Sequence, residues 1–128
     1  MILGIGTDLA KIARFEQLLA RRGDAICQRL LTPAERQAMQ KTAQPAAFLA
    51  KRFAAKEALL KALGTGLRDG LSWQQIEVSN DALGKPLLAL SGVAEQKAQA
   101  LGVKQIHLSL SDEQEMALAF VLLEGNSA

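Results

Sequence analysis

The hydrophobic pattern begins with a short strand followed by an amphipathic helix. Residues 2–7 (ILGIGT) predict a strand in which Gly4 and Gly6 let another backbone come close. Residues 9–22 predict a helix that ends at Gly23. The apolar side of this helix is formed by Leu9, Ile12, Phe15 and Leu19.

Two more helices are expected in the first half of the chain. Thr32-Pro33-Ala34-Glu35 combines a capping residue, a proline at the first helical position and a glutamate three residues after the cap, so a helix begins there. The next helix starts after Pro45 and is rich in alanine and leucine. It ends at Gly64-Thr65-Gly66.

The second half of the chain predicts mainly strands. They are expected at 75–79, 86–90, 105–111 and 116–123. A helix at 93–101 ends at Gly102. Because strands and helices do not alternate regularly, the expected fold class is α+β, with an antiparallel sheet packed against helices. We expect a single domain at 1–125 and a short polar tail at 126–128.

The last predicted strand, residues 116–123, is apolar at nearly every position. A strand of this kind is expected to be covered on both faces. A chain of 128 residues has a limited core, so we expect a neighbouring subunit to complete the cover.

Composition and charge narrow the functional classes. The chain is 49% hydrophobic and 22% charged, as in ordinary globular domains. A formal net charge of +2 is too small to indicate nucleic-acid binding, and the longest apolar run, 116–123, is too short to cross a bilayer. The lone Cys27 permits no internal disulfide and fits a reducing compartment. We therefore expect a cytosolic protein that binds neither nucleic acid nor membrane.

An acidic residue interrupts the apolar stripe of the third helix. The stripe consists of Ala46, Leu49, Phe53, Glu57 and Leu60. Burying an ionised carboxylate without a partner is costly, so Glu57 either lies at an edge or meets a cation. Lys61, one turn later, offers an (i, i+4) pair, but an exposed pair of this kind contributes only about 0.2–0.5 kcal/mol.

Asp8 follows the first predicted strand, where the first helix is expected to begin. It is therefore either a helix N-cap or, beside the glycines, a metal ligand. Mg²⁺ commonly takes one or two carboxylates and completes its shell with water and phosphate oxygens, which suits Asp8 with Glu57. Lys61 would then bind phosphate oxygens, and Gly64-Thr65-Gly66 offers a turn with free amides.

Two polar surfaces complete the candidate chemistry. His107, Ser109 and Ser111 share one strand face, which either meets solvent or provides donors for an anion; their alternation does not make a Ser-His-Asp triad. One side of the first helix is basic and is either a solvated face or a dock for an acidic partner. Its residues are Lys11, Arg14, Leu18, Arg21 and Arg22.

Three segments together resemble one family. They are GTDL at 6–9, RFAAKEALLKALGTG at 52–66 and HLSLSD at 107–112, with NDALGKP at 80–86 as a further match. They are similar to the holo-acyl-carrier-protein synthases, the small trimeric members of the 4′-phosphopantetheinyl transferases. The resemblance implies an α+β fold, Mg²⁺ as cofactor, coenzyme A as donor, a serine of apo-acyl carrier protein as acceptor, 3′,5′-ADP as product, and a role in fatty acid biosynthesis.

The resemblance also implies roles for individual residues. Asp8 and Glu57 match metal ligands, Lys61 matches the lysine that contacts the pyrophosphate, and Glu57 is the expected base for the serine proton. Residues near the nucleotide are Arg52, Gly64, His107 and Ser109, with Gly84, Lys85 and Pro86 near the adenine. In the family the site lies between subunits of a trimer, so Asp8, Glu57 and Lys61 are expected from one chain and His107 and Ser109 from its neighbour. The basic helix would dock the acidic carrier protein.

Two other functional classes remain open from the residues themselves. A small RNA-binding module would use the basic helix, but 4 Phe, 1 Trp and 0 Tyr leave few platforms for base stacking. A different Mg²⁺-dependent phosphoryl-transfer enzyme would suit Asp8, Glu57 and Lys61 equally well. It would leave the basic helix without a role.

Overall fold

The structure is a computed structural model that describes residues 1–126. Its strands are β1 (Ile2–Lys11), β2 (Ile76–Asn80), β3 (Pro86–Leu90), β4 (Val103–Asp112) and β5 (Met116–Gly125). Its helices are α1 (Ile12–Leu30), α2 (Pro33–Met39), α3 (Pro45–Leu63) and α4 (Gly92–Leu101), with the 3₁₀ turn η1 (Trp73–Gln75). Of the predicted polar tail, residues 127–128 lie outside the described part of the chain.

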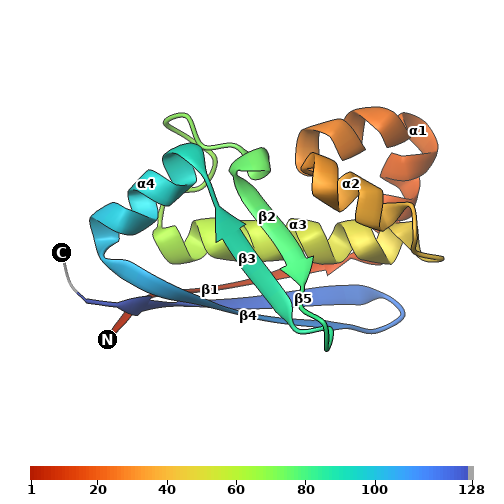
Figure 1. The fold of residues 1–128 in the computed structure, drawn as a ribbon. Coiled ribbons are helices and arrows are strands. Elements are labelled where there is room, and N and C mark those ends of the chain that lie inside the picture. Colours follow the sequence, from red (N-terminus) through yellow and green to blue (C-terminus); the bar gives the residue numbers. More distant parts are fainter. Residues whose placement is uncertain (127–128) are drawn as a thin grey trace.

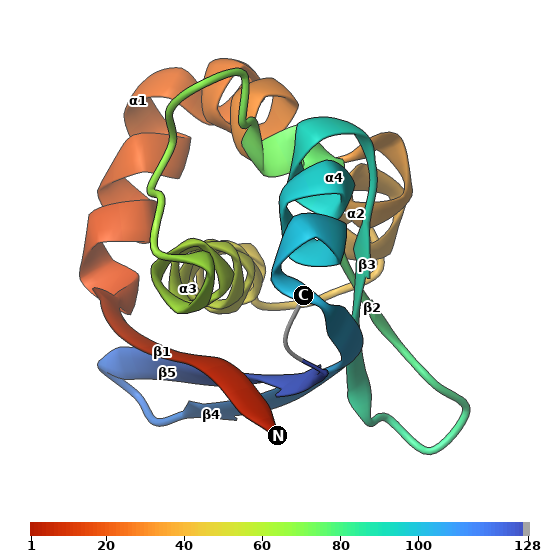
Figure 2. The same ribbon diagram turned by 90° about the vertical axis from the view of Figure 1, so that its left-hand side faces the viewer.

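A three-stranded antiparallel sheet carries the long helix α3 on one face. Its strand order is β1-β5-β4, while β2 and β3 form a separate antiparallel hairpin. Figure 1 shows α3 running along the sheet with α1 and α2 near one end and α4 near the other, and Figure 2 shows α3 end-on above the sheet. The predicted α+β class with an antiparallel sheet is confirmed.

The predicted signals at the ends of three helices are also confirmed. In α2, Thr32 Oγ1 accepts a hydrogen bond from the Glu35 amide at 3.3 Å, and the Glu35 side chain accepts one from the Thr32 amide at 2.9 Å. Helices α3 and α4 end at Gly64 and Gly102, whose φ angles are 79° and 91°. Glycine adopts this left-handed conformation without the strain that a Cβ would bring.

The glycines of β1 allow direct contact between two backbones. A Cβ built at Gly6 would lie 2.0 Å from the carbonyl oxygen of Ala58, and one at Gly4 would lie 2.2 Å from that of Ala62. The predicted close approach is therefore confirmed, and its partner is α3. This contact fixes how the strand and the helix that carry the candidate site lie against each other.

The predicted boundaries of the first helix were wrong. Residues 8–11 belong to β1, because they pair with β5 as far as Lys11 opposite Met116. The helix also continues beyond Gly23 to Leu30, with a kink at Arg22, where φ is −146° and ψ is 45°. Buried side chains in its last turns, including Leu30, supply packing that outweighs the local stop signal.

The last strand is covered on one face only within this chain. Ala117, Ala119, Val121 and Leu123 are buried. On the opposite face, Leu118 and Phe120 are 41% and 38% exposed. Ile5 and Leu9 of β1, whose register partners are Leu122 and Leu118, extend the same exposed surface. We call these exposed apolar residues Ile5, Leu9, Leu118 and Phe120 the outer sheet face. The prediction that Leu9 lies on the apolar side of the first helix was therefore wrong, because Leu9 belongs to β1.

No helix in residues 1–126 has the length and apolar character that a membrane span requires.

We predict that Gly6→Ala destabilises the protein, because the added Cβ meets a backbone atom that cannot move aside. The expected loss exceeds about 1 kcal/mol, the lower end of typical overpacking costs, and thermal unfolding measures it. The control is Gly23→Ala, because a Cβ there meets no atom within 4 Å. Gly23→Ala should leave the Tm unchanged or raise it. A Gly6→Ala protein with the parental Tm would contradict the close contact.

Candidate active site

The contact between β1 and α3 brings together the first group of predicted site residues. Asp8 lies on the inner face of the sheet and is mostly buried, with 14% of its side chain exposed. The Lys61 ammonium lies 2.9 Å from Asp8 Oδ1 and donates to the carbonyl oxygen of Thr7 at 3.0 Å. The N-cap interpretation of Asp8 is wrong, because Asp8 pairs with Ala119 inside the sheet and the helix N-cap is Lys11.

Glu57 belongs to the same cluster. Burial is the largest cause that raises the pKa of Glu57, and the negative charge of Asp8 raises it further, whereas Lys61 and Arg14 lower it. Among ion pairs in the described residues, Lys61 contacts Asp8 and not Glu57. The (i, i+4) pair on α3 therefore does not account for a charge in the apolar stripe.

The cluster contains a carboxylate oxygen that has no hydrogen-bond partner in this chain. Asp8 Oδ2 is buried and has no hydrogen-bond partner. No group of three or more metal-ligating side chains occurs within residues 1–126. Two carboxylates are nevertheless what Mg²⁺ commonly takes from a protein when substrate phosphates and water complete its shell. Asp8 and Glu57 thus fit a Mg²⁺ site of that kind.

A cleft of about 490 Å³ collects the second group of predicted residues, Arg52, Gly84 and Pro86. Arg52 is only 6% exposed, its guanidinium lies 4.2 Å from the ring centroid of Phe48, and its Nε has no hydrogen-bond partner. Burial lowers the pKa of Arg52, and Glu35 opposes this. A buried cation with a free donor beside a cleft is suited to bind an anion.

The cleft also contains cations that sequence reasoning missed. Lys41 and Lys51 line it, and Lys51 Nζ lies 3.5 Å from Asp112 Oδ1. Lys51 lies directly before the motif that begins at Arg52, and this position was the sequence signal that could have identified it. Gly84, with φ of 90°, and Lys85 form the turn between β2 and β3 beside this cleft. Three cations, Arg52 among them, therefore line the cleft together with one carboxylate, that of Asp112.

His107, Ser109 and Ser111 lie on the opposite side of the sheet from Asp8. They are exposed, and their register partners on β5 are Leu122, Phe120 and Leu118. They therefore lie beside the outer sheet face. His107 Nε2 lies 3.0 Å from Glu124 Oε1. The shared strand face is confirmed, but one chain does not bring these residues to Asp8.

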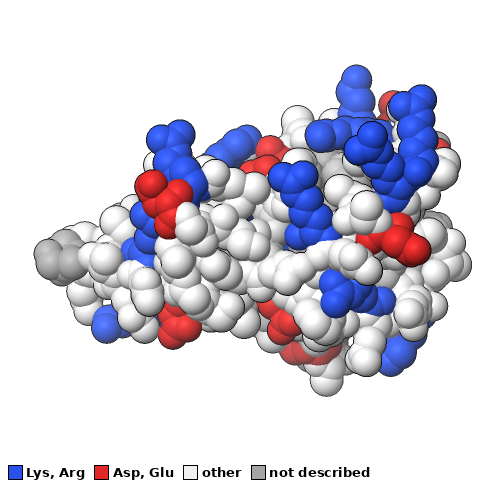
Figure 3. All heavy atoms as spheres, turned by 90° about the horizontal axis from the view of Figure 1, so that it is seen from above, with Lys and Arg blue, Asp and Glu red and all other residues white. Residues whose placement is uncertain are grey.

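The basic surface of α1 is exposed. Arg14, Arg21 and Arg22 are exposed on this helix, and Leu18 packs partly against the core. The Arg14 guanidinium lies 5.3 Å from the ring centroid of Phe53 on α3. Figure 3 shows Lys and Arg side chains gathered at the end of the molecule where Figure 1 places α1 and α2. Lys11 is exposed too, but as the last residue of β1 rather than as part of the helix.

The comparisons with known proteins now identify the family. A family model described as the 4′-phosphopantetheinyl transferase superfamily matches residues 4–121. The chain is 56% identical over 127 residues to a holo-[acyl-carrier-protein] synthase of Alkalilimnicola ehrlichii, covering 98% of this chain and 99% of that protein. The chain belongs to the holo-acyl-carrier-protein synthases. The resemblance noted from its motifs is confirmed, and the chain is an enzyme of the transferase class.

Solved structures of this synthase family have the same fold. The holo-[acyl-carrier-protein] synthase of Neisseria meningitidis is similar with a TM-score of 0.88 and 44% identity, covering 97% of this chain and 99% of that one. A Bacillus anthracis holo-(acyl-carrier-protein) synthase in complex with CoA (3′,5′-ADP) is similar with a TM-score of 0.81 and 40% identity, covering 98% and 99%. The α+β architecture is therefore that of the synthase family.

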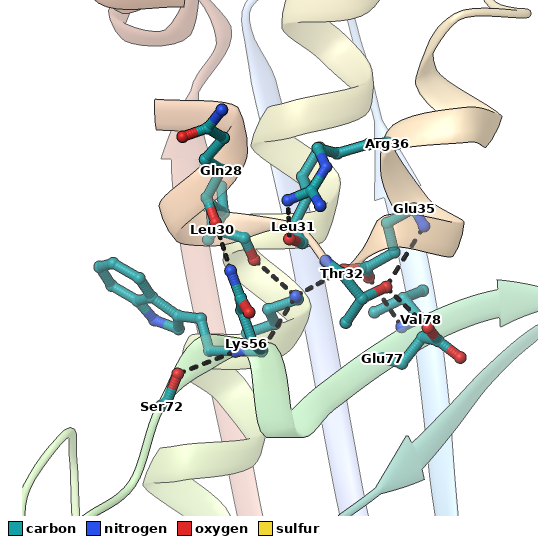
Figure 4. Close-up of polar contacts among 12 residues, drawn as sticks. Gln28, Leu30, Leu31, Thr32, Glu35, Arg36, Lys56, Ser72, Glu77 and Val78 are labelled. Carbon is teal, nitrogen blue, oxygen red and sulfur yellow. Dashed lines mark hydrogen bonds and ion pairs between the residues drawn. The ribbon is translucent and has the colours of Figure 1, made fainter. Parts of the chain in front are cut away.

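One buried ion pair escaped the sequence analysis. Lys56 Nζ lies 2.6 Å from Glu35 Oε1, and both side chains are 0% exposed (Figure 4). Burial lowers the pKa of Lys56, while the charge of Glu35 opposes this. Glu35 was predicted only as part of a capping box, and nothing in its local sequence indicated a partner on another helix.

The raised pKa of Glu57 predicts a gain in stability from Glu57→Gln. A carboxyl whose pKa is raised by folding favours the folded state at low pH, and this contribution is lost as the pH rises through the folded pKa. In buffer with a chelator, Glu57→Gln should therefore raise the Tm near neutral pH by a few degrees. The gain should shrink toward about pH 4, where Glu57 is protonated and no longer opposes folding.

Glu16→Gln is the control, because Glu16 is an exposed carboxylate on α1. It should show no comparable rise in Tm with pH. A Glu57→Gln protein that is less stable than the parent near neutral pH would contradict a desolvated carboxylate in this cluster.

Proposed function

We propose that the chain transfers the 4′-phosphopantetheine group of coenzyme A to a serine of apo-acyl carrier protein, with Mg²⁺ required and 3′,5′-ADP released. The observation that carries this proposal is the cluster of Asp8, Glu57 and Lys61, which a strand and a helix bring together from two of the family motifs. The Bacillus anthracis relative in complex with CoA (3′,5′-ADP) supports the choice of donor and product.

The cluster provides groups for each charge in this reaction. Asp8 and Glu57 would hold Mg²⁺, which when bound supplies positive charge beside the pyrophosphate. The Lys61 ammonium, now bonded to Asp8, is the proposed donor to pyrophosphate oxygens. Glu57, whose pKa is raised by burial, is the proposed acceptor of the serine proton.

The proposed transfer exchanges one phosphorus–oxygen bond for another. The serine oxygen forms a bond to the phosphorus that carries pantetheine, and the bond from that phosphorus to the bridging oxygen of the pyrophosphate breaks. The proton passes to Glu57, and the electron pair leaves with 3′,5′-ADP. Positive charge from Lys61 stabilises the oxygens on which negative charge grows.

The cleft around Arg52 is the proposed nucleotide site. Its buried guanidinium and the neighbouring Lys41 and Lys51 suit the phosphate of the nucleotide, and Gly84, Lys85 and Pro86 offer a turn for the adenine. Gly64 ends α3 three residues beyond Lys61 and is proposed to border the same ligand. The prediction of free amides in this turn was wrong for Gly64 and Thr65, because the Gly64 amide donates to the carbonyl oxygens of Leu60 and Lys61 and the Thr65 amide donates to that of Leu60.

We also propose that three copies of the chain share their sites. His107 and Ser109 lie on the opposite sheet face from Asp8, so they reach the same ligand only if they come from another copy. The outer sheet face beside them leaves large apolar side chains exposed, which a neighbouring subunit would cover. A ring of three copies uses one heterologous contact repeatedly and closes on itself.

The exposed basic surface of α1 is the proposed dock for the carrier protein. Acyl carrier proteins are acidic as a class, and complementary charge steers association and sets the relative orientation. The residues assigned to this contact are Lys11, Arg14, Leu18, Arg21 and Arg22.

We predict that the protein forms a phosphopantetheine adduct on apo-acyl carrier protein in the presence of coenzyme A and Mg²⁺, detected by mass. Asp8→Asn and Glu57→Gln should each reduce the rate at least about a hundredfold, since each removes charge that the transition state requires. Glu16→Gln is the matched control and should retain activity. Absence of an adduct with the parent protein would overturn the proposed function. Near-normal rates of either site variant at low Mg²⁺ would overturn the metal-ligand assignment.

Subunit mixing tests whether sites are shared. Glu57→Ala and His107→Ala proteins, each nearly inactive, are unfolded, mixed in equal amounts and refolded together. If chains assort at random, about one quarter of the sites take Glu57 from a His107→Ala chain and His107 from a neighbouring Glu57→Ala chain. These sites are complete, so about one quarter of the activity should return. If each chain holds a complete site, no activity returns, although native mass measurement detects mixed trimers.

A further inference from the structure

The proposed chemistry leaves the buried pair Lys56 and Glu35 unused. Lys56 is the residue immediately before Glu57 on α3, yet its ammonium is 0% exposed and turns away from solvent. Outside this pair, the ion pairs of the described residues involve at least one partly exposed side chain. The pair is therefore a distinct feature of the molecule.

Every polar group of the pair has a partner. Besides Glu35, Lys56 Nζ donates to the carbonyl oxygen of Leu30 at 2.6 Å and to that of Trp73 at 3.0 Å (Figure 4). Glu35 also accepts from the amides of Thr32 at 2.9 Å and Val78 at 2.8 Å. All three donors of the ammonium are used, and both oxygens of the carboxylate are occupied.

These contacts join five segments to one point of α3. They reach the end of α1 at Leu30, the linker at Thr32, α2 at Glu35, η1 at Trp73 and β2 at Val78. A buried ion pair is often no more stabilising than apolar side chains of the same size. What it adds is a defined geometry, since each hydrogen bond requires its partner at one distance and direction.

A second set of contacts leads from this point toward the active site. The Trp73 ring lies 6.0 Å from the Phe53 ring between centroids, and Arg14 lies 5.3 Å above the Phe53 ring. Phe53 is one helical turn before Glu57. Arg14 of the proposed docking helix is thus packed against α3 one turn from the proposed base. Lys56 holds the main chain of Trp73, whose ring is a second neighbour of Phe53.

We infer that Lys56 and Glu35 are positioning residues for the reaction with the carrier protein. They hold the end of α1 and the segment that ends in η1 against α3. Through the rings of Trp73 and Phe53 they thereby support Arg14 of the docking surface beside Glu57. This inference rests on the proposed function. It predicts that loss of the pair impairs use of the carrier protein more than use of coenzyme A, whose proposed cleft lies around Arg52.

The test is the double variant Lys56→Met/Glu35→Gln. It removes both charges together, so no unpaired ion is left in the core, and the introduced glutamine side chain keeps an oxygen for a backbone amide. At a temperature where the variant is folded, kcat/KM for apo-acyl carrier protein should fall about tenfold or more while KM for coenzyme A stays within about twofold. Amide hydrogen exchange at residues 64–75 should be faster than in the parent.

A stability control separates positioning from a general loss of structure. Leu123→Ala truncates a buried side chain of β5 that takes no part in the hydrogen bonds of the pair, and it should lower the Tm without this kinetic split. Wild-type carrier kinetics and exchange in a folded double variant would overturn the inference. An inactive parent protein would overturn the proposed function instead, and the exchange measurement would still decide whether the pair holds the segment.

Trp73→Leu provides a second variant that leaves the ion pair in place. It removes the ring between Phe53 and Arg29, both of which it contacts, but keeps the carbonyl that accepts from Lys56. It should lower kcat/KM for the carrier protein and leave KM for coenzyme A unchanged. If the double variant does not fold, unchanged carrier kinetics in Trp73→Leu overturn the inference.

Discussion

The direct contact of β1 with α3 is the constraint on which the rest of the structure depends. Gly4 and Gly6 have no Cβ, so carbonyl oxygens of α3 occupy the space that other side chains would fill. This spacing lets the Lys61 ammonium reach Asp8 Oδ1 at 2.9 Å, although the two residues lie in different elements. A larger residue in β1 would move the strand away and separate the groups proposed to hold metal and phosphate.

The alternation of side chains along the sheet then divides the functional groups into two sets. Asp8 faces α3, whereas His107 and Ser109 lie beside exposed apolar residues on the other face. No side-chain rotation brings one set to the other through a sheet. A site that uses both sets therefore requires a second copy of the chain, and the exposed Leu118 and Phe120 provide a surface for one.

Two adjacent charged residues of α3 lie in opposite environments. Lys56 is buried with a partner for every donor, whereas Glu57, the next residue, has its pKa raised by burial and by Asp8. Asp8 Oδ2 is left without a partner as well. Partly buried carboxylates without full hydrogen bonding, such as Asp8 and Glu57, are typical of groups that bind a ligand. The fully paired Lys56 and Glu35 are instead typical of residues that fix the relative position of packed segments.

The sequence by itself determined the features that depend on a few adjacent residues. The capping box at Thr32, the glycine ends of α3 and α4 and the strands of the second half were predictable from local chemistry, whereas the family was indicated by the resemblance of three motifs. Only the tertiary structure decided that β1 runs to Lys11, that α1 passes Gly23, and that Glu35 meets Lys56. Those outcomes depend on partners distant in the chain, whose pairing and packing outweigh the local signals.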